Sequence, residues 1–479
     1  MTVAGSDSAA PRYRFAGQDG AVWLGLRVVP LAALAAGVVL AVGGLYLGFP
    51  VPVAVLVLVA GVVLASVPIA GQRGAEWLGP LTRRATSAAT SADRWSTNPC
   101  GALAVASSSS RVLRLPREYG RLRLLDAEGG AVGVVDDAAA RAYTVVLAVA
   151  GVDRFTLMDP GEQAARLSGW GNALSGLAAD PDIRRIQWVE RAGPDRRDAT
   201  AWLRERAATR DDADAVDDYA ALATRLSSAA RRHEVWLAVQ LSRRSGGSRT
   251  GGRAAVGERV REVMSALLAA DLVARPLPVA ELGWLLRRFV DHQVGPVDAE
   301  PLVGQLGPSS RRTGWAELRT DDSWHRSFAI AGWPRVPVPA SWLEPLLAGW
   351  SPPAVRTLSL HLQPVPPPVA AREARAARTR ARLDRAERLR LGLTDAPAIA
   401  WAETDAEDTE QELLAGYRLH RVAGVISCTA GDLAGLDEAC RSVRAAAAAA
   451  RVDLRPMHGQ HDVGLLASLP LCRVDGRAS

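Results

Sequence analysis

The strongest constraint on the fold of this chain is a long uncharged stretch near its N-terminus. Between Arg27 and Arg73 there is no Asp, Glu, Lys or Arg, and most residues are Val, Leu, Ala or Gly. A single helix of this length would be about 68 Å long at 1.5 Å per residue, whereas the hydrocarbon core of a bilayer is only about 30 Å thick. Two helices fit better than one, so the sequence predicts a transmembrane helical hairpin over residues 28–70.

The turn of this hairpin is marked by Gly48, Pro50 and Pro52. Both prolines lack a backbone N–H, and Pro52 disfavours helical geometry at the residue before it. We therefore expect spans over residues 28–47 and 53–70. Close contact between the helices is expected at four small residues, which are Gly37, Gly43, Gly44 and Gly61. A signal peptide followed by a single anchor is disfavoured, because no cleavage region precedes the second span.

Charged residues on both sides of the stretch predict its orientation. Arginines precede and follow the hairpin, and the connecting turn carries no charge. The positive-inside rule then places both termini in the cytoplasm, with residues 1–27 as a cytosolic tail. The four cysteines form no CxxC pair, which is typical of a reducing compartment. The sequence thus predicts a multi-pass protein of the inner (plasma) membrane that contacts the lipid bilayer.

The remainder of the chain alternates between strand and helix patterns. Residues 71–110 resemble a juxtamembrane helix followed by a linker rich in Ser and small residues. Strand–helix–strand units then recur in two sets, over residues 111–300 and 301–475. We expect an α+β fold: an N-terminal transmembrane hairpin followed by a cytosolic α/β-sandwich domain of two subdomains, with two ferredoxin-like halves as one arrangement.

One segment has the glycine spacing of a phosphate-binding loop. Gly247 and Gly252 are separated by four residues, between a predicted strand and a predicted helix. Arg253 stands where such a loop places the lysine that reaches the β- and γ-phosphates, and Ala254 stands where it places the hydroxyl that binds magnesium. We therefore expect no catalytic and no cofactor-binding residue here, and we interpret the segment as a basic loop.

A second candidate for chemistry is a pair of histidines close to the C-terminus. His458 and His461 have an HxxH spacing, and Cys472 follows. Zinc requires three or four converging ligands, and a single HxxH in a loop does not supply them. The sequence also lacks a G-x-S-x-G nucleophile motif. We expect no metal site, no cofactor and no enzymatic activity.

A strongly basic helix is predicted over residues 370–391. Between residues 372 and 390 it holds eight arginines and three acidic residues. One interpretation is a basic face that binds a partner, formed by Arg375, Arg378, Arg382 and Arg385. DNA, anionic lipid and an acidic protein remain open as the ligand. The alternative, which we favour, is a solvated helix stabilised by pairs such as Asp384–Arg388, or a protein contact.

Four segments of the chain, residues 67–85, 115–137, 143–151 and 184–195, carry a resemblance to a known family. They resemble an actinobacterial family of integral membrane proteins encoded with conjugative elements and grouped with PrgI-like proteins. In that family's secretion systems, a small two-helix membrane subunit adjoins an ATPase that has an N-terminal non-motor domain. The chain looks like the two-helix subunit joined to such a non-motor domain, and residues 422–450 are similar to the end of that domain.

The resemblance implies a role without catalysis. It predicts a scaffold of a conjugation or type IV-like secretion system that docks a separate motor ATPase at the membrane, within a multi-subunit complex. Two alternatives stay open at this point. One is a type VII secretion membrane component, and the other is a membrane-bound enzyme that hydrolyses nucleotides.

Overall fold

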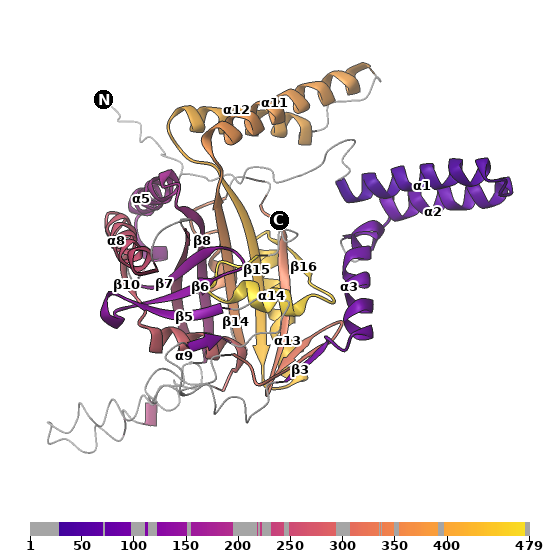
Figure 1. Ribbon diagram of the computed structural model, residues 1–479. Helices are drawn as coiled ribbons and strands as arrows, with labels where there is room; N and C mark the ends of the chain where they lie inside the picture. The colour runs from indigo at the N-terminus through magenta and orange to yellow at the C-terminus, as the bar shows by residue number, and fades with distance from the viewer. Residues whose placement is uncertain are drawn as a thin grey trace, which may run out of the picture.

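A computed structural model gives the structure of the chain. It describes residues 28–69, 72–96, 111–113, 122–150, 155–194, 218, 221–222, 231–243, 249–293, 307–334, 336, 338–348, 354–390 and 397–474. Most of these residues form an α+β body around one large sheet of 14 strands whose paired strands all run antiparallel. Two helical hairpins project from this body (Figure 1).

The first half of the sheet comes from the strands before residue 277. These strands are β4 (Arg111–Leu113), β5 (Leu122–Ala127), β6 (Val132–Asp137), β7 (Ala142–Ala150), β8 (Ile183–Pro194), β9 (Arg231–Ser242) and β10 (Val273–Pro276). The accompanying helices are α5 (Pro160–Ala179), α8 (Arg249–Leu268) and α9 (Val279–Val290). Asp159 caps α5 by accepting a hydrogen bond from the backbone N–H of Gly161, and Pro160 occupies the first helical turn.

The second half is built from later strands and from one early strand, β3 (Arg94–Ser96), at its edge. The later strands are β11 (Ser310–Thr313), β12 (Leu318–Thr320), β13 (Ser323–Gly332), β14 (Val355–Pro364), β15 (His420–Ala430) and β16 (Asp453–Pro456). Its helices are α10 (Glu344–Leu347), α11 (Pro367–Arg390), α12 (Pro397–Leu414), α13 (Leu433–Ala449) and α14 (His461–Ser468).

The two halves repeat one order of elements. The order β7–α5–β8–β9–α8–β10–α9 recurs as β13–α10–β14–β15–α13–β16–α14. In each half the fourth strand pairs with the first, and the third strand lies between the first and the second. This is the arrangement of a ferredoxin-like β-α-β-β-α-β unit. Antiparallel pairing of β8 with β14 joins the two halves into one sheet.

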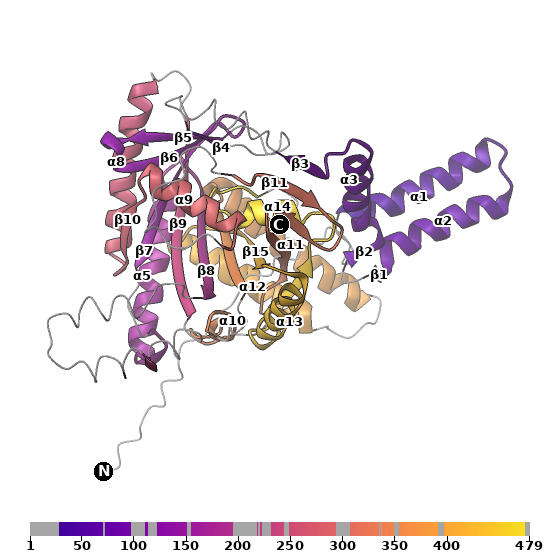
Figure 2. The same cartoon turned by 90° about the horizontal axis from the view of Figure 1, so that it is seen from below.

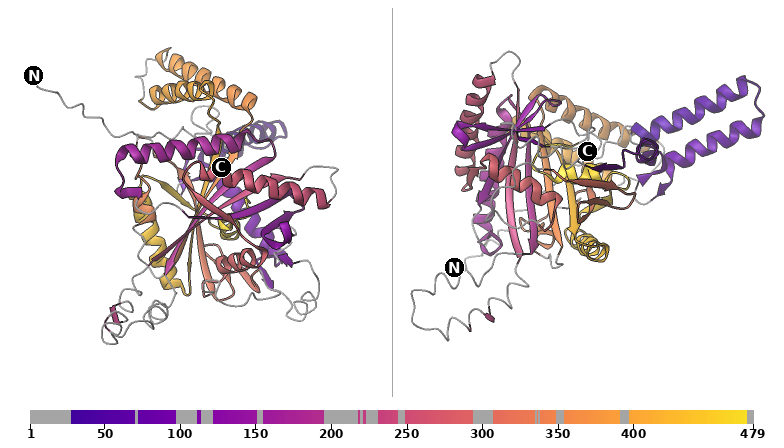
Figure 3. Two further views of the ribbon diagram at one scale, coloured as in Figure 1. Left: turned by 90° about the vertical axis from the view of Figure 1, so that its left-hand side faces the viewer. Right: turned by 60° about the horizontal axis from the view of Figure 1, so that its bottom comes forward.

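Helices cover both faces of this sheet, so the body has three layers. On one face, α5 and α8 cover the first half and α10 and α13 cover the second (Figure 3). On the other face, α9 and α14 share one apolar cluster with residues such as Val189 and Trp236. Side chains alternate between the two faces along each strand. This alternation explains why neighbouring strand residues contribute to different clusters.

A buried ion pair spans the seam between the halves. Arg356 of β14 is fully buried, and its guanidinium donates to both carboxylate oxygens of Glu190 on β8 at 2.5 and 2.6 Å. His233 of β9 approaches the same carboxylate at 2.8 Å. Arg356 also donates to the carbonyl oxygen of Leu346 in α10. The pair therefore ties three strands and one helix together at the centre of the sheet.

The predicted transmembrane hairpin is wrong. The uncharged stretch does form two antiparallel helices, α1 (Val28–Tyr46) and α2 (Val51–Ser66), but α2 has only 16 residues. At 1.5 Å per residue it rises about 24 Å, and a crossing needs about 20 residues. The stretch ends early because β1 (Pro68–Ile69) and β2 (Gln72–Arg73) pair as short strands.

No helix in the described part of the chain is long and apolar enough to cross a membrane. The predicted multi-pass location in the inner membrane, with both termini in the cytoplasm, is therefore wrong as well. The expected juxtamembrane segment is a short 3-10 helix, η1 (Gly74–Trp77), that leads directly into α3 (Leu78–Ala89). Figure 2 shows α1 and α2 extending away from the sheet beyond α3.

The sheet face beneath α14 is unusually polar for a core. Gln187 and Ser359 donate to the carbonyl oxygen of Ala467 at 3.0 Å in each case, and Gln187 also donates to Leu469. These side chains satisfy carbonyls that the end of a helix leaves without intrahelical partners. Three histidines are buried on this face, and burial lowers the pKa of His325, His361 and His461 to about 3 in each case.

These histidines predict a loss of stability in mild acid. Each has a folded-state pKa below its unfolded value of about 6.5, so the unfolded chain binds protons first as the pH falls. Stability is fully present above about pH 6.5 and decreases by up to about 1.4 kcal/mol per pH unit for each histidine below it. Urea unfolding at about pH 7 and about pH 5.5 should differ by up to about 4 kcal/mol for the three together.

A matched variant isolates one of these contributions. His361→Gln removes a titrating group but keeps a donor for Ala467, which His361 contacts at 2.9 Å through Nε2. The variant should show a smaller difference between the two pH values than the wild type. An equal difference in both proteins would show that His361 does not gain a proton on unfolding in this pH range.

Candidate docking site

The α1–α2 hairpin is held together by close approach of two glycines. A Cβ atom at Gly37 would lie 3.1 Å from the Cα of Gly61, and a Cβ at Gly61 would lie equally close to Gly37. Both glycines are buried between the helices, together with Ala41, Ala54 and Ala65. Small residues on one side of each helix thus let the backbones approach. Of the four predicted packing glycines, the structure brings these two together.

The other two predicted packing glycines lie elsewhere. A Cβ at Gly43 would meet nothing within 4 Å, so this residue faces away from α2 in the described structure. Gly44 faces the ring of Phe49, which would lie 3.3 Å from an added Cβ. Gly44 therefore packs against the turn of its own hairpin.

Gly48, Pro50 and Pro52 of the predicted turn occupy three different positions in the structure. Gly48 has a φ of +83°, which L residues with a side chain rarely adopt. Pro50 is the N-cap of α2 in extended geometry, and Pro52 lies in the first helical turn, where a missing N–H costs nothing. The turn is therefore shorter than expected, and α2 starts before Pro52.

The outer surface of this hairpin is apolar and exposed. Val39 and Leu56 are each 69% exposed, and Phe49 at the tip is 56% exposed. Neither helix has a polar face in its described part, so the apolar surface continues around the hairpin. Contiguous exposed apolar patches of more than a few hundred Å² are rare on monomeric proteins and mark interaction sites.

Stacked rings attach the hairpin to the body. The indole of Trp77 in η1 lies 5.8 Å from that of Trp315 and 5.9 Å from the imidazole of His458, with all three rings stacked. Trp315 belongs to the turn between β11 and β12, and His458 follows β16. Gly459 allows this contact, because its φ is +68° and a Cβ there would lie 3.0 Å from the Trp315 ring.

Two ion pairs of α3 support the same attachment. Arg83 donates to Asp462, the second residue of α14, at 3.1 Å, and Asp462 is only 7% exposed. Arg311 approaches the same carboxylate from β11 at 3.5 Å. Arg84 donates to the carbonyl oxygen of Thr313 at 2.8 Å and approaches Asp93 at 3.7 Å. Apolar stacking and charge together fix the hairpin with respect to the sheet.

The second projecting hairpin, α11–α12, contains the predicted basic face. Six acidic residues and no basic one lie on α12, opposite the arginines of α11. Arg378 pairs with Glu410, Arg382 approaches Glu407 at 3.2 Å and Glu403 at 3.4 Å, and Arg385 approaches Glu403 at 3.1 Å. Three of the four predicted arginines therefore face the partner helix of their own hairpin.

Arg375 is the remaining predicted arginine, and it is exposed. Buried alanines, Ala370, Ala374, Ala381 and Ala406, bring α11 and α12 together along the side that bears the ion pairs. The predicted basic surface is thus largely an intramolecular contact between α11 and α12.

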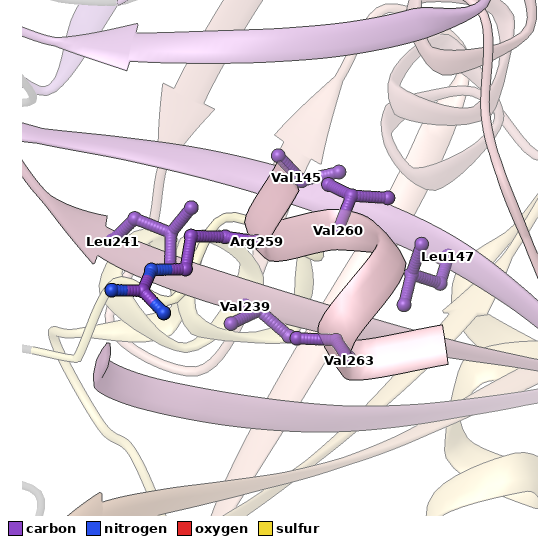
Figure 4. Close-up of a pocket in the computed structure, with 7 residues that line it drawn as sticks. All are labelled: Val145, Leu147, Val239, Leu241, Arg259, Val260 and Val263. Carbon is purple, nitrogen blue, oxygen red and sulfur yellow. The ribbon is translucent and has the colours of Figure 1, made fainter. Parts of the chain in front are cut away.

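The residues suggested for enzymatic chemistry do not converge. Helix α8 already begins at Arg249, so positions 252 to 254 lie in helix and not in a loop that could surround phosphates, while Gly247 lies outside the described residues. A cavity beneath α8 measures about 10 Å³ and is lined by Val145, Leu147 and other apolar residues (Figure 4). This is the size of about one water molecule.

The histidine pair has a structural role. His461 is buried and accepts a hydrogen bond from the backbone N–H of Ser327 at 3.1 Å, while His458 belongs to the ring stack. Burial raises the pKa of the Cys472 thiol to about 12. In the described residues no three His, Cys, Asp or Glu side chains are placed to hold a metal ion.

The attachment residues were not singled out from sequence as a contact. Trp77, Trp315 and His458 are far apart in the chain, and only the pairing of β11 with β12 and of β13 with β16 brings them together. The local signal in the sequence is the position of Trp77, four residues after Arg73, which ends the uncharged stretch. Its partners could not be inferred without the sheet.

Comparison with models of known protein families gives no match, and comparison with curated proteins gives none either.

Replacing Gly37 tests the packing of the first hairpin. Gly37→Leu should separate α1 from α2, because the added side chain meets the backbone of Gly61, and overpacking of this kind costs about 1–3 kcal/mol. Limited proteolysis within residues 28–73 should accelerate accordingly. Gly43→Leu is the matched control, since its Cβ would meet nothing within 4 Å. Equal proteolysis rates for the two variants would contradict the assigned contact.

A charge-reversal cycle tests the second hairpin. Arg378→Glu should lower helix content, measured by circular dichroism at low salt, and Glu410→Arg in the same chain should restore it. Exposed pairs contribute about 0.2–1 kcal/mol, so the effect should be small and should vanish at about 1 M salt. Arg380→Glu is the control, because it reverses an exposed charge on the same helix. Adding Glu410→Arg to this variant should not restore helix content. Failure of the Arg378→Glu, Glu410→Arg double variant to recover would refute the pairing.

Proposed function

We propose that this protein is a non-enzymatic scaffold subunit of a multi-subunit assembly, of the conjugation or type IV-like secretion type, and that it docks a separate motor ATPase. One observation carries the proposal: an exposed apolar hairpin, α1–α2, is fixed to a large body through Trp77 and Arg83. Covering such a surface with apolar groups is favourable in water, and exposed patches of this kind mark interaction sites. Apolar helices of the docked motor ATPase form the cover in this proposal.

The body supports a scaffold better than a catalyst. Its buried charges pair with one another, as in the two hydrogen bonds from Arg288 to Glu234 at 3.1 and 2.8 Å. Its buried histidines stay neutral near pH 7, since their pKa is about 3. The cavity under α8 is too small for a nucleotide, because ligand sites usually measure about 300 Å³ or more. The resemblance of residues 67–85 and 115–137 to a docking family points to a motor ATPase as the partner.

Co-expression with a motor ATPase of the conjugation or type IV-like class from the same genome provides the test. The full chain and the ATPase should elute as one complex whose mass, measured by light scattering, exceeds that of either protein. The double variant Val39→Asp, Leu56→Asp places two charges on the apolar surface and should dissociate the complex. Leu414→Asp is the control, because Leu414 is an 84% exposed apolar residue at the end of α12.

Two results would count against the proposal. A complex that survives the double variant would show that the hairpin is not the docking surface. Hydrolysis of ATP by the purified chain alone would show that it is an enzyme. The same assay on the complex should detect hydrolysis of ATP, because the partner supplies the activity.

A further inference from the structure

A row of three arginines crosses the outermost strands of the second half of the sheet. Arg94 of β3 pairs in register with Arg312 of β11, and Arg312 pairs in register with Arg319 of β12. Residues directly opposite one another in a sheet point to the same face. All three arginines are exposed. The two chain neighbours of Arg312 in β11, Arg311 and Thr313, are buried on the opposite face.

This arrangement is unfavourable for folding. Like charges directly opposite one another in antiparallel strands destabilise the sheet. In the part of the chain that the structure describes, the guanidinium groups of Arg94 and Arg312 make neither a hydrogen bond nor an ion pair. Arg319 approaches Asp322 at 3.7 Å and donates to the backbone carbonyl oxygen of Asp321 at 3.2 Å. Among the described residues, the row is thus a concentration of positive charge in which Arg94 and Arg312 have no acidic partner.

An aromatic residue continues the row on the next strand. Trp324 of β13 pairs in register with Arg319, and the Arg319 guanidinium lies 5.3 Å from the centroid of its ring. Trp324 is half-buried. Its other neighbour in register, Ala430, ends β15 shortly before α13 begins, so the helix covers the face only beyond this point. The row therefore runs from the edge strand to an indole at the margin of the face that α13 covers, where Trp324 packs against the apolar cluster beneath that helix.

We propose that this arginine row binds the phosphate backbone of a single-stranded nucleic acid, with the Arg319–Trp324 pair as the platform for a base. Guanidinium groups match phosphate oxygens in a planar, two-pronged geometry. Adjacent strands lie about 4.8 Å apart, so the three cations form a short track and not a single point. Positive grooves flanked by aromatic platforms bind single strands with little sequence preference.

The arginines of α11 do not compete for this role. Arg378, Arg382 and Arg385 are engaged with α12, whereas Arg94 and Arg312 are uncompensated among the described residues. The proposal is independent of the scaffold function, because α1–α2 plays no part in it. Loss of nucleic-acid binding and loss of the ATPase complex are therefore separate outcomes.

Fluorescence anisotropy of a labelled 20-nucleotide oligo-dT with the full chain tests the proposal. Single-strand affinity falls with salt by about 0.7 log units per log unit of salt for each phosphate contact. Arg312→Gln should therefore lower the salt slope by about 0.7 and weaken binding about fivefold at about 0.1 M salt. Arg261→Gln is the control with the same change in net charge, since Arg261 is 69% exposed on α8. Equal losses for the two variants would overturn the assigned surface.

The melting temperature of Arg312→Gln distinguishes a lost contact from a lost fold. Because the substitution relieves repulsion between neighbouring guanidinium groups, the melting temperature should stay unchanged or rise. A lower melting temperature would attribute the weaker binding to unfolding and would overturn the proposal.

Competition with polyanions distinguishes a nucleic acid from an acidic protein segment. Inorganic polyphosphate and poly-glutamate of matched length should compete less well than unlabelled oligo-dT, because neither has bases to stack on Trp324. Equal competition by poly-glutamate would overturn the proposal in favour of an acidic protein segment.

Discussion

The antiparallel pairing of β8 with β14 is the contact on which the rest of the structure depends. Without it the two repeats would each expose an edge strand, and exposed edges pair with other chains. The buried pair of Glu190 with Arg356 lies on this seam. Replacing a buried pair by apolar residues is often neutral, but removing one partner leaves an isolated buried charge and costs about 3–5 kcal/mol. The pair thus contributes more to the choice of register than to net stability.

The seam also determines where the two hairpins project. Helices α11 and α12 replace the turn between β14 and β15, so their ion pairs are held next to the joint of the repeats. Helix α14 is attached to the same region through Gln187 and Ser359, and its Asp462 holds α3 through Arg83. A continuous set of polar contacts therefore connects the central strands to the base of α1–α2. These contacts with the sheet therefore set the direction in which α1–α2 projects.

Part of this arrangement follows from the sequence and part does not. Glycine and proline chemistry places the turn at Gly48, and strand–helix patterns reveal two similar sets, because both signals are local. The transmembrane prediction is wrong for a physical reason: composition alone does not reveal that residues 68–69 and 72–73 pair as strands and shorten α2. Likewise, the arginines of α11 indicate a free basic face only until the acidic residues of α12 are placed beside them.

The pairing of strands and helices determines the environment of each arginine, which composition does not reveal. Every cation of this chain is an arginine, and the formal charge of +6 does not distinguish one arginine from another. The fold divides them by environment: Arg356 is buried against a carboxylate, Arg378 is paired across a hairpin, and Arg312 faces solvent between two other cations. In the last environment like charges lie directly opposite one another, which is unfavourable in a sheet. Binding of a polyanion relieves that repulsion, so the least stable arrangement of charge in the sheet is also the one best prepared for a ligand.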